Sequence, residues 1–249
     1  MNLTGYENTE NKPSILVIDS GIGGLSVCES ILANEQNLQI IYFADDAFFP
    51  YGLQDEAVLR QRLKYIVAEM LARHQPELIV LACNTVSTLV LPELRASFDV
   101  PFVGVVPAIK PAASMSKTKR IGLLATPATV KRAYTDQLVS DYADECDVIR
   151  VGSSELVVQA ENLLQGRVVC RDTLSRVLKP FHCFNGQKPV DTIVLGCTHF
   201  PFLQHEFRRI LPEVMWVDSG AAIAMRVFSL LADVDFSRVE APVHQLYFS

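Results

Sequence analysis

Two short stretches of the chain echo each other: Leu-Ile-Val-Leu-Ala-Cys-Asn-Thr at residues 78–85 and Thr-Ile-Val-Leu-Gly-Cys-Thr-His at residues 192–199. Each is an apolar run that stops at a small residue and is followed by a cysteine and polar side chains. Continuous apolar runs of this length are typical of strands buried on both faces of a parallel sheet. The polar residues then fall at the carboxyl end of the strand, where open α/β sheets bind ligands. The same arrangement therefore occurs twice, and each copy delivers one thiol, Cys83 or Cys197.

A second pair of stretches indicates that the chain has two related halves. Ile-Leu-Val-Ile-Asp-Ser-Gly at residues 15–21 resembles Ile-Gly-Leu-Leu-Ala-Thr-Pro at residues 121–127, and both pairs are separated by a similar length of chain. Internal repetition of this kind fixes an architecture, although apolar strands also resemble one another by composition alone. Each half would then carry one hydroxyl and one thiol at strand ends.

Strand and helix patterns alternate along the chain, which indicates right-handed βαβ units and parallel sheets. The predicted fold is α/β, with two pseudo-symmetric parallel-sheet domains and the active site in the cleft between them. Residues 1–105 plus 213–249 form the first predicted domain, and residues 106–212 form the second. The predicted strands lie at residues 14–18, 39–44, 78–82, 101–106, 120–125, 147–151, 191–195, 215–217 and, at a sheet edge, 245–248. The predicted helices lie at residues 25–33, 54–74, 86–98, 126–142, 153–165, 171–184, 201–210 and 221–231, with residues 114–118 as the passage into the second half.

Composition excludes several classes of protein. The 249 residues are 49% hydrophobic and 20% charged, which is typical of a compact globular chain. A net charge of −6 without a basic cluster argues against nucleic acid as a partner. The apolar runs are shorter than the roughly 20 residues needed to cross a bilayer, so no membrane partner is expected. Residues 1–12 are polar and lack the apolar segment of a secretory signal, which predicts a cytoplasmic location.

The cysteines predict free thiols and no metal site. None of the six forms a Cys-x-x-Cys pair or stands at zinc-finger spacing from a histidine. Without an export signal the compartment is expected to be reducing. Four cysteines have no polar cluster beside them and are interpreted as small buried hydrophobes; they are Cys28, Cys146, Cys170 and Cys183.

Three chemistries suit the two remaining thiols. A shared metal has few other ligands nearby, and a redox disulfide would have the usual short spacing, which is absent. The third is acid/base chemistry on opposite faces of one substrate carbon, with one thiolate removing a proton while the other thiol returns one. Two quasi-equivalent halves favour this last interpretation, because they would place one thiol on each side of a cleft. Such a reaction inverts a stereocentre without any cofactor.

Neighbouring residues fit the same interpretation. Each cysteine precedes a predicted helix start, which should partly activate the thiol. His199 is the natural acid/base partner of Cys197, and Asp19 has the matching place near Cys83. The glycine-rich turn at residues 21–24 exposes backbone amides that suit an anion. Its spacing is not that of a dinucleotide fingerprint, so a carboxylate is as plausible as a phosphate, while simple helix capping by Asp19 or Ser20 is the plainer alternative.

Five motifs in order carry a resemblance to a known family. They are Asp-Ser-Gly-Ile-Gly-Gly at 19–24, Pro-Tyr-Gly at 50–52, Ala-Cys-Asn-Thr at 82–85, Gly-Cys-Thr-His at 196–199 and Val-Asp-Ser-Gly at 217–220. Together they resemble the bacterial glutamate racemases of the cofactor-independent aspartate/glutamate racemase family. The resemblance implies interconversion of L- and D-glutamate without a cofactor, which supplies D-glutamate for peptidoglycan. It leaves open a cell-wall precursor as activator and a homodimer.

The resemblance also implies roles for individual residues. Cys83 and Cys197 would be the catalytic thiols, assisted by Asp19 and His199. The implied substrate-binding residues are Asp19, Ser20, Tyr51, Gly52, Asn84, Thr85, Thr126, Thr129, Glu161, Thr198 and His199. Hydroxyl, amide and backbone donors of this kind can neutralise two carboxylates without a basic side chain, and an aspartate accommodates an ammonium.

Two departures from the family pattern concern only the rim of the pocket. Asp46 stands where threonine is frequent, and serines at residues 153–154 replace a Cys-Pro pair. Three alternatives stay open at this point. The chain could racemise aspartate or another acidic amino acid, it could bind an anion or nucleotide without catalysis, or it could act by binding and inhibiting another enzyme.

Overall fold

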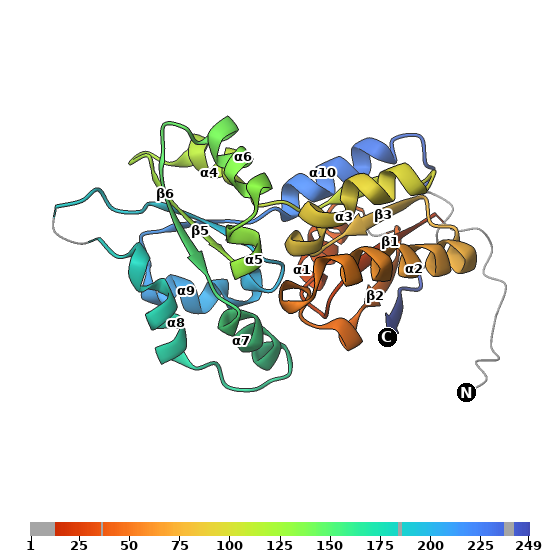
Figure 1. The fold of residues 1–249 in the computed structure, drawn as a ribbon, viewed down its shortest axis with the longest axis horizontal. Coiled ribbons are helices and arrows are strands. Elements are labelled where there is room, and N and C mark those ends of the chain that lie inside the picture. Colours follow the sequence, from red (N-terminus) through yellow and green to blue (C-terminus); the bar gives the residue numbers. More distant parts are fainter. Residues whose placement is uncertain (1–12, 36, 184–185, 237–241) are drawn as a thin grey trace.

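Two parallel sheets, each at the centre of one lobe, make up the computed structural model, which describes residues 13–35, 37–183, 186–236 and 242–249 (Figure 1). The first sheet has the strand order β4-β3-β1-β2-β9 and the second the order β6-β5-β7-β8. The strands of the first sheet are β1 Ser14–Asp19, β2 Gln39–Ala44, β3 Leu78–Leu81, β4 Phe102–Gly104 and β9 Gln245–Phe248. Those of the second are β5 Arg120–Ala125, β6 Asp147–Gly152, β7 Thr192–Gly196 and β8 Met215–Val217. The polar leader at residues 1–12 lies outside the described residues.

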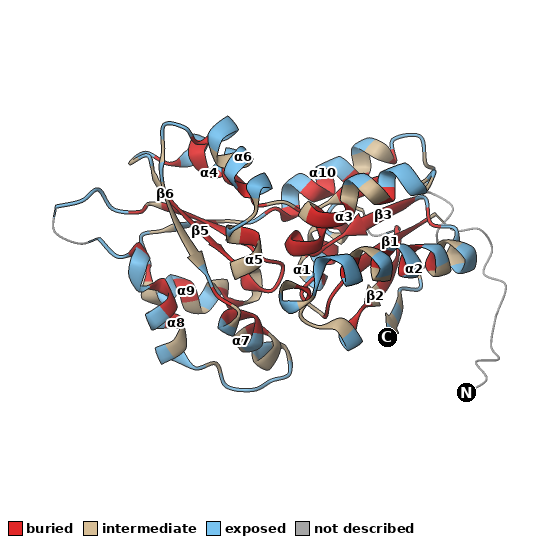
Figure 2. Ribbon diagram, viewed as in Figure 1, coloured by how far each residue is buried: buried red, intermediate tan, exposed pale blue. Residues whose placement is uncertain are grey.

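The central strands are continuous apolar runs because helices cover both of their faces. Every residue of β1, β3 and β7 is buried. In the first lobe, α1 (Leu25–Leu32) and α10 (Gly220–Leu230) pack on one face, and α2 (Glu56–His74) and α3 (Asn84–Ser97) pack on the other. Figure 2 shows the buried strands at the centre of each lobe and the exposed outer faces of the helices.

The second lobe has the same three layers. One face of its sheet is covered by α4 (Ile109–Met115) and α6 (Ala133–Tyr142). The opposite face is covered by α7 (Glu155–Leu164), α8 (Arg171–Leu178) and α9 (Gln204–Ile210). The short helix α5 (Pro127–Val130) follows β5 and lies at the boundary with the first lobe (Figure 1). The described residues also form 3₁₀ turns, namely η1 (Asp46–Phe48), η2 (Tyr51–Leu53), η3 (Lys179–Phe181) and η4 (Phe200–Leu203).

The two sheets are built on the same plan. If the four strands of each half are counted in chain order, both sheets have the spatial order four, three, one, two. Strand β1 therefore corresponds to β5, and β3 corresponds to β7. Strand β9 is the addition, paired in parallel with β2 at the sheet edge. The α/β fold with two pseudo-symmetric parallel sheets is confirmed, and so is the predicted edge strand at residues 245–248.

The boundary between the halves differs from the predicted one. Strand β8 pairs with β7, so residues 215–217 belong to the second sheet and not to the segment that returns to the first. A three-residue apolar strand can complete either sheet, and the sequence does not say which. The chain thus crosses between the lobes after β4 and again after β8. At this crossing the hydroxyl of Ser219 donates to the carbonyl of Val106 over 2.5 Å.

Three helices differ from the prediction. Helix α4 occupies residues 109–115, where no helix was predicted, and its last two residues fall in the passage expected at residues 114–118. The single helix predicted at residues 126–142 is two helices, because Arg132 is extended, with ψ of 139°, and starts α6. The helix predicted at residues 171–184 ends at Leu178 and passes into the 3₁₀ turn that contains Pro180; residue 184 lies outside the described residues. Within the described part of the chain, no helix is both long and apolar enough to cross a bilayer.

Candidate active site

Strand pairing brings the predicted thiols and hydroxyls to matching edges of the two sheets. In the first sheet Ile18 pairs with Leu81, so the residues after β1 lie beside those after β3. In the second sheet Ala125 pairs with Gly196, so Thr126 and Cys197 follow neighbouring strand ends. Because parallel strands end at the same edge, each sheet presents one thiol next to the end of its first strand.

In the corner of the site around Cys197, three side chains contact one another in series: Cys197, His199 and Glu161. The Nδ1 atom of His199 lies 3.9 Å from the Sγ atom of Cys197. The Nε2 atom of the same ring lies 2.7 Å from Oε1 of Glu161, on α7. Both Cys197 and His199 are buried, and the ring of Phe49 lies 5.9 Å from the imidazole between centroids. The predicted partnership of His199 with Cys197 is therefore present in the structure, and Glu161 extends it.

The pKa of His199 is raised from 6.5 to about 10. Burial alone would lower this pKa, but hydrogen bonds to Cys197 and Glu161 outweigh burial, and the charge of Asp19 acts in the same direction. At neutral pH the imidazole is thus an imidazolium, with one N–H directed at each partner.

The surroundings of Cys83 are apolar, in contrast to the charged surroundings of Cys197. Cys83 precedes α3 and lies among apolar side chains of the first core. Burial raises the pKa of its thiol well above the usual range, and the nearby charge of Asp19 raises it further. The backbone amides of residues 85 and 86 lower the pKa, but by less. The activation expected from the helix start is therefore wrong as a net effect at Cys83, because desolvation is larger than the contribution of two amides.

Asp19 interacts electrostatically with both corners. Its side chain is fully buried, and the backbone N–H of Gly24 donates to Oδ2 over 2.8 Å. Its pKa is raised overall, because the effect of burial is larger than the opposing effects of His199 and the backbone amides. Among the described residues Oδ1 has no hydrogen-bond partner. The amide of Gly24, the residue just before α1, is therefore used by Asp19 and is unavailable to an external anion, while no side chain caps the helix itself.

Three hydroxyls join the lobes beside the thiols. Thr85 lies 3.1 Å from Thr126 and 3.2 Å from Thr129, and these two lie 3.0 Å from each other, between Oγ1 atoms. Thr85 comes from α3 of the first lobe and the other two from the second. A methyl group placed on Gly52 would lie 3.8 Å from Thr126 and 3.9 Å from Thr85. The predicted residues Gly52, Thr85, Thr126 and Thr129 are thus brought together.

Three of the other predicted site residues are also buried, and one of them has an unpaired polar atom. Asn84, at the start of α3, is buried, and its Oδ1 has no partner among the described residues. Ser20 and Thr198 are buried at the ends of β1 and β7. Buried polar atoms are nearly always hydrogen-bonded, so an unpaired amide oxygen indicates a place for a ligand donor.

Tyr51 differs from its predicted role in one respect. Its side chain is buried in the first core, and its hydroxyl donates to Oδ2 of Asp45 over 2.9 Å. Asp45 is fully buried and is also bonded by the guanidinium of Arg62, with the shortest contact at 2.6 Å. The polar tip of Tyr51 therefore serves to hold the loop before Gly52, and only its backbone remains for a ligand.

A cavity of about 210 Å³ opens beside this site. It is bordered by Asn84, Cys197 and Thr198 on one side and by residues of α1 and α10 on the other. Within the part of the chain that the structure describes, no group of three His, Cys, Asp or Glu side chains has the arrangement of metal ligands.

Several residues of the site carry no local signal in the sequence. The ring of Phe49 packs near His199, and the hydroxyl of Ser26 donates to the carbonyl of Thr198 over 2.8 Å. These contacts join positions far apart in the chain, so a pattern of neighbouring residues cannot reveal them.

Comparison with known proteins identifies the family. The sequence pattern of the Asp/Glu/Hydantoin racemase family matches residues 15–227. The chain belongs to the Asp/Glu/hydantoin racemase family. Glutamate racemase of Pectobacterium atrosepticum is 47% identical over 229 residues, which is 92% of this chain and 80% of that protein. Glutamate racemase of Escherichia coli K12 is 49% identical over 224 residues, which is 90% of this chain and 78% of the relative.

Solved racemase structures have the same fold. The crystal structure of Escherichia coli glutamate racemase in complex with L-glutamate and the activator UDP-MurNAc-Ala has a TM-score of 0.89 and 46% identity, covering 95% of this chain and 89% of that one. Glutamate racemase of Francisella tularensis in complex with D-glutamate has a TM-score of 0.77 and 25% identity, covering 96% and 88%. The resemblance to racemases expected from the five motifs is thereby confirmed.

Proposed function

We propose that this chain interconverts L- and D-glutamate by moving a proton at Cα between Cys83 and Cys197. The observation that carries the proposal is that the two sheets share one order of four strands, and that a buried thiol follows the same strand in each. Identity of 47% to 49% with curated glutamate racemases supports glutamate as the substrate. The D-glutamate formed would serve peptidoglycan synthesis.

The different surroundings of the two thiols assign their starting states. In this proposal Cys197, whose Sγ lies 3.9 Å from Nδ1 of His199, accepts the proton first, and Cys83, whose pKa is raised by burial, supplies the proton that replaces it. In one direction the Cα–H bond breaks as an S–H bond forms at Cys197, and the carbanion takes the proton of Cys83 on its opposite face. The stereocentre is inverted and the two sulfurs have exchanged protonation states. The reverse direction starts with Cys83 as the base, and no cofactor takes part.

The remaining polar groups suit the charged ends of glutamate. The hydroxyls of Thr85, Thr126 and Thr129, together with Ser20 and Thr198, provide donors for carboxylate oxygens. The unpaired acceptors Asp19 Oδ1 and Asn84 Oδ1 are what the three donors of an ammonium require. Glu161 acts on the substrate through His199 in this scheme and does not bind it directly.

We further propose that a cell-wall precursor activates this chain. The support is the Escherichia coli relative, whose crystal structure is in complex with the activator UDP-MurNAc-Ala. A cytoplasmic location and a homodimer stay predictions from the sequence and its resemblance to the family.

Deuterium wash-in tests the proposal. Purified protein is incubated in D₂O with L-glutamate, D-glutamate, L-aspartate or D-aspartate, with and without UDP-MurNAc-Ala. We expect both glutamates to gain α-deuterium and to interconvert, while Cys83→Ser and Cys197→Ser lose racemisation by at least about 10³-fold. The matched control is Cys170→Ser, which changes an exposed cysteine of the second lobe. Exchange of aspartate and not glutamate would overturn the assigned substrate, and full activity in either active-site mutant would overturn the two-thiol mechanism.

A further inference from the structure

The glycine turn, residues 21–24, has no role in the reaction as described so far. Its sequence suggested an anion site at the start of α1, but the amide of Gly24 is bonded to Asp19. Among the described residues, the glycines with positive φ are Gly166 and Gly186, so the turn does not require glycine for its backbone conformation. The reason for glycine must therefore be space, and the neighbouring atoms show what occupies that space.

Gly23 packs directly against the imidazole of His199. A methyl group at Gly23 would lie 2.3 Å from Nδ1, 2.5 Å from Cε1 and 2.8 Å from Cγ of the ring. These separations are far below van der Waals contact, so any side chain at this position must displace the ring. The buried ring has little room to move, because its other nitrogen is held by Glu161 at 2.7 Å.

Gly21 packs against the next member of the same chain of side chains. A methyl group at Gly21 would lie 3.1 Å from Oε1 of Glu161 and 3.0 Å from Cδ2 of Phe49. The turn of the first lobe thus contacts both the imidazole and the carboxylate of the second lobe. Only backbone without side chains can approach the pair this closely.

Ser26 ties the same turn to the loop that carries Cys197. Its hydroxyl lies 2.8 Å from the carbonyl oxygen of Thr198 and 2.9 Å from that of Gly23. A hydroxyl has one proton to donate, so these two carbonyls, one from each lobe, share it. The residue between Cys197 and His199 is therefore fixed to the turn that supports the imidazole.

We propose that the glycine turn is the packing surface that holds His199 in line with Cys197, and that Gly23 and Ser26 are positioning residues for this thiol. The proposal rests on the proposed function for its effect on catalysis. It means that the first lobe, besides supplying Cys83, sets the geometry of the opposite acid/base group. Displacement of the ring by a fraction of an ångström would weaken the contacts to Sγ and to Glu161 together.

The main test is a double-mutant cycle of Gly23→Ala with His199→Ala. In the wild-type background we expect Gly23→Ala to lower kcat by about 10²-fold, the scale of a misplaced acid/base group. In the His199→Ala background, where no ring can clash, the same change should alter kcat by less than about twofold. An equal loss in both backgrounds would overturn the proposal, since the glycine would then act on something other than His199.

A second measurement does not depend on racemisation. Iodoacetamide labelling resolved by peptide mass spectrometry gives the alkylation rate of each thiol separately. Gly23→Ala should slow alkylation of Cys197 by about tenfold, because the thiolate loses its cation, and leave exposed Cys170 unchanged. If glutamate is not racemised at all, the proposed function fails. The alkylation rate of Cys197 still tests whether the glycine turn positions His199. An unchanged alkylation rate of Cys197 in a folded Gly23→Ala mutant overturns the proposal that the turn positions His199.

Ser26 supplies a milder variant in case Gly23→Ala does not fold. Ser26→Ala should lower kcat about threefold to tenfold, the value of one partly buried hydrogen bond, with KM changed less. Its matched control is Ser30→Ala, one turn further along α1, where the hydroxyl donates only to the helix carbonyl of Ser26. Equal activity of Ser26→Ala and Ser30→Ala would remove Ser26 from the proposal.

Discussion

The two thiols end corresponding strands, yet the second residue after each cysteine is different. After Cys83 it is Thr85, whose hydroxyl joins two threonines of the other lobe. After Cys197 it is His199, whose ring connects the sulfur to Glu161. One corner is neutral and rich in hydroxyls, and the other contains an imidazolium between two acids. The same backbone plan therefore supports two different environments, one in which burial raises the pKa of the Cys83 thiol and one in which an imidazolium lies beside Cys197.

The difference matters because racemisation needs one proton acceptor and one proton donor at the same time. A fully symmetric pair of thiols would begin as two neutral groups, and a proton would have to leave before any reaction. Burial and the charge of Asp19 keep Cys83 protonated, while the same charge helps to keep His199 protonated beside Cys197. In the proposed two-thiol mechanism, this asymmetry would prepare the pair without an external base.

Among changes outside the two thiols, the largest effect is expected from His199→Gln, which removes the cation beside Cys197 alone. We expect kcat for glutamate to fall by about 10²-fold to 10³-fold. The measurement is steady-state kinetics with α-deuterated L- and D-glutamate. The isotope effect on kcat/KM should rise for the enantiomer that Cys197 deprotonates and not for the other.

His205→Gln, which changes an exposed histidine on α9, is the control and should behave as the wild type. If the isotope effects change equally for both enantiomers, His199 acts on both thiols alike. The contrast drawn between the surroundings of Cys83 and Cys197 would then be wrong.

The next effect concerns the hydroxyl corner. Thr85→Val keeps the shape of the side chain and removes the hydroxyl that meets Thr126 and Thr129. Loss of a hydrogen bond to a carboxylate should raise KM for glutamate by about tenfold and change kcat less. Thr88→Val on the same helix is the matched control, because its hydroxyl bonds only to carbonyls of the preceding turn. An unchanged KM in Thr85→Val would mean that the hydroxyls only join the lobes.

A smaller effect should appear in stability as a function of pH. The folded pKa of His199 is raised from 6.5 to about 10, so its contribution to the free energy of unfolding is complete below pH 6.5. That contribution is lost progressively as the pH rises toward about 10, because the unfolded chain no longer carries the proton. The stability advantage of the wild type over His199→Gln should thus shrink by at least about 1 kcal/mol between pH 7 and pH 10. Urea unfolding at both pH values measures it, and a constant difference would contradict the imidazolium.

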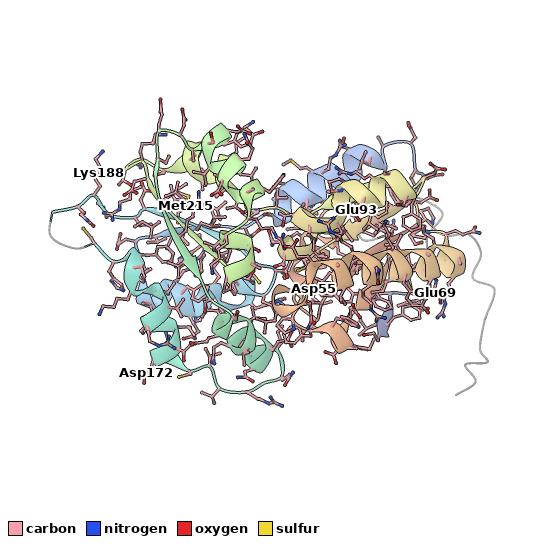
Figure 3. All side chains as sticks on the ribbon, viewed as in Figure 1. Asp55, Glu69, Glu93, Asp172, Lys188 and Met215 are labelled. Carbon is pink, nitrogen blue, oxygen red and sulfur yellow. The ribbon has the colours of Figure 1, made fainter. Side chains whose placement is uncertain are left out.

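The smallest effect should come from an ion pair on the outside of the cleft. Arg132, between α5 and α6, bonds to Glu56 of the first lobe over 2.7 Å. Figure 3 shows Asp55, the capping residue just before Glu56, at the end of α2 nearest the second lobe. Since the side chain of Glu56 is 58% exposed, Arg132→Gln should cost less than about 1 kcal/mol.

The assay for Arg132→Gln is urea unfolding together with KM for glutamate, which should change less than about threefold. The control is Arg73→Gln, whose partner Glu69 lies on the same helix. A larger increase in KM than that of Thr85→Val would reverse the ranking of the contacts that join the lobes.

Prediction from sequence succeeded where a pattern is local. The buried strands, the thiols at their ends and the edge strand at residues 245–248 all follow from apolar runs and their terminating residues. Helix α4 was missed because seven residues with a proline in the first turn give no clear helical period. Strand β8 was assigned to the wrong half because its three residues do not encode their pairing partner.

Prediction of the site failed where the role of a residue depends on its tertiary contacts, above all on contacts between the lobes. The glycine turn looked like an anion site because glycines at a helix start commonly expose amides. In the structure one amide is used by Asp19, and the space at Gly23 is filled by the ring of His199. Net activation of Cys83 was expected from the start of α3, but the degree of burial that outweighs it depends on the whole core.

The double crossing between the lobes limits how the molecule can move. Both connections pass side by side, and the bond from Ser219 to Val106 fastens one to the other. Two bodies joined along a single line keep essentially one degree of freedom, rotation about that line, while sliding and twisting are suppressed. Any opening of the lobes would therefore pivot at this crossing, and closure would return Cys83 and Cys197 to the same relative position. A reaction that needs two sulfurs in line through one carbon gains from this repeatable closure.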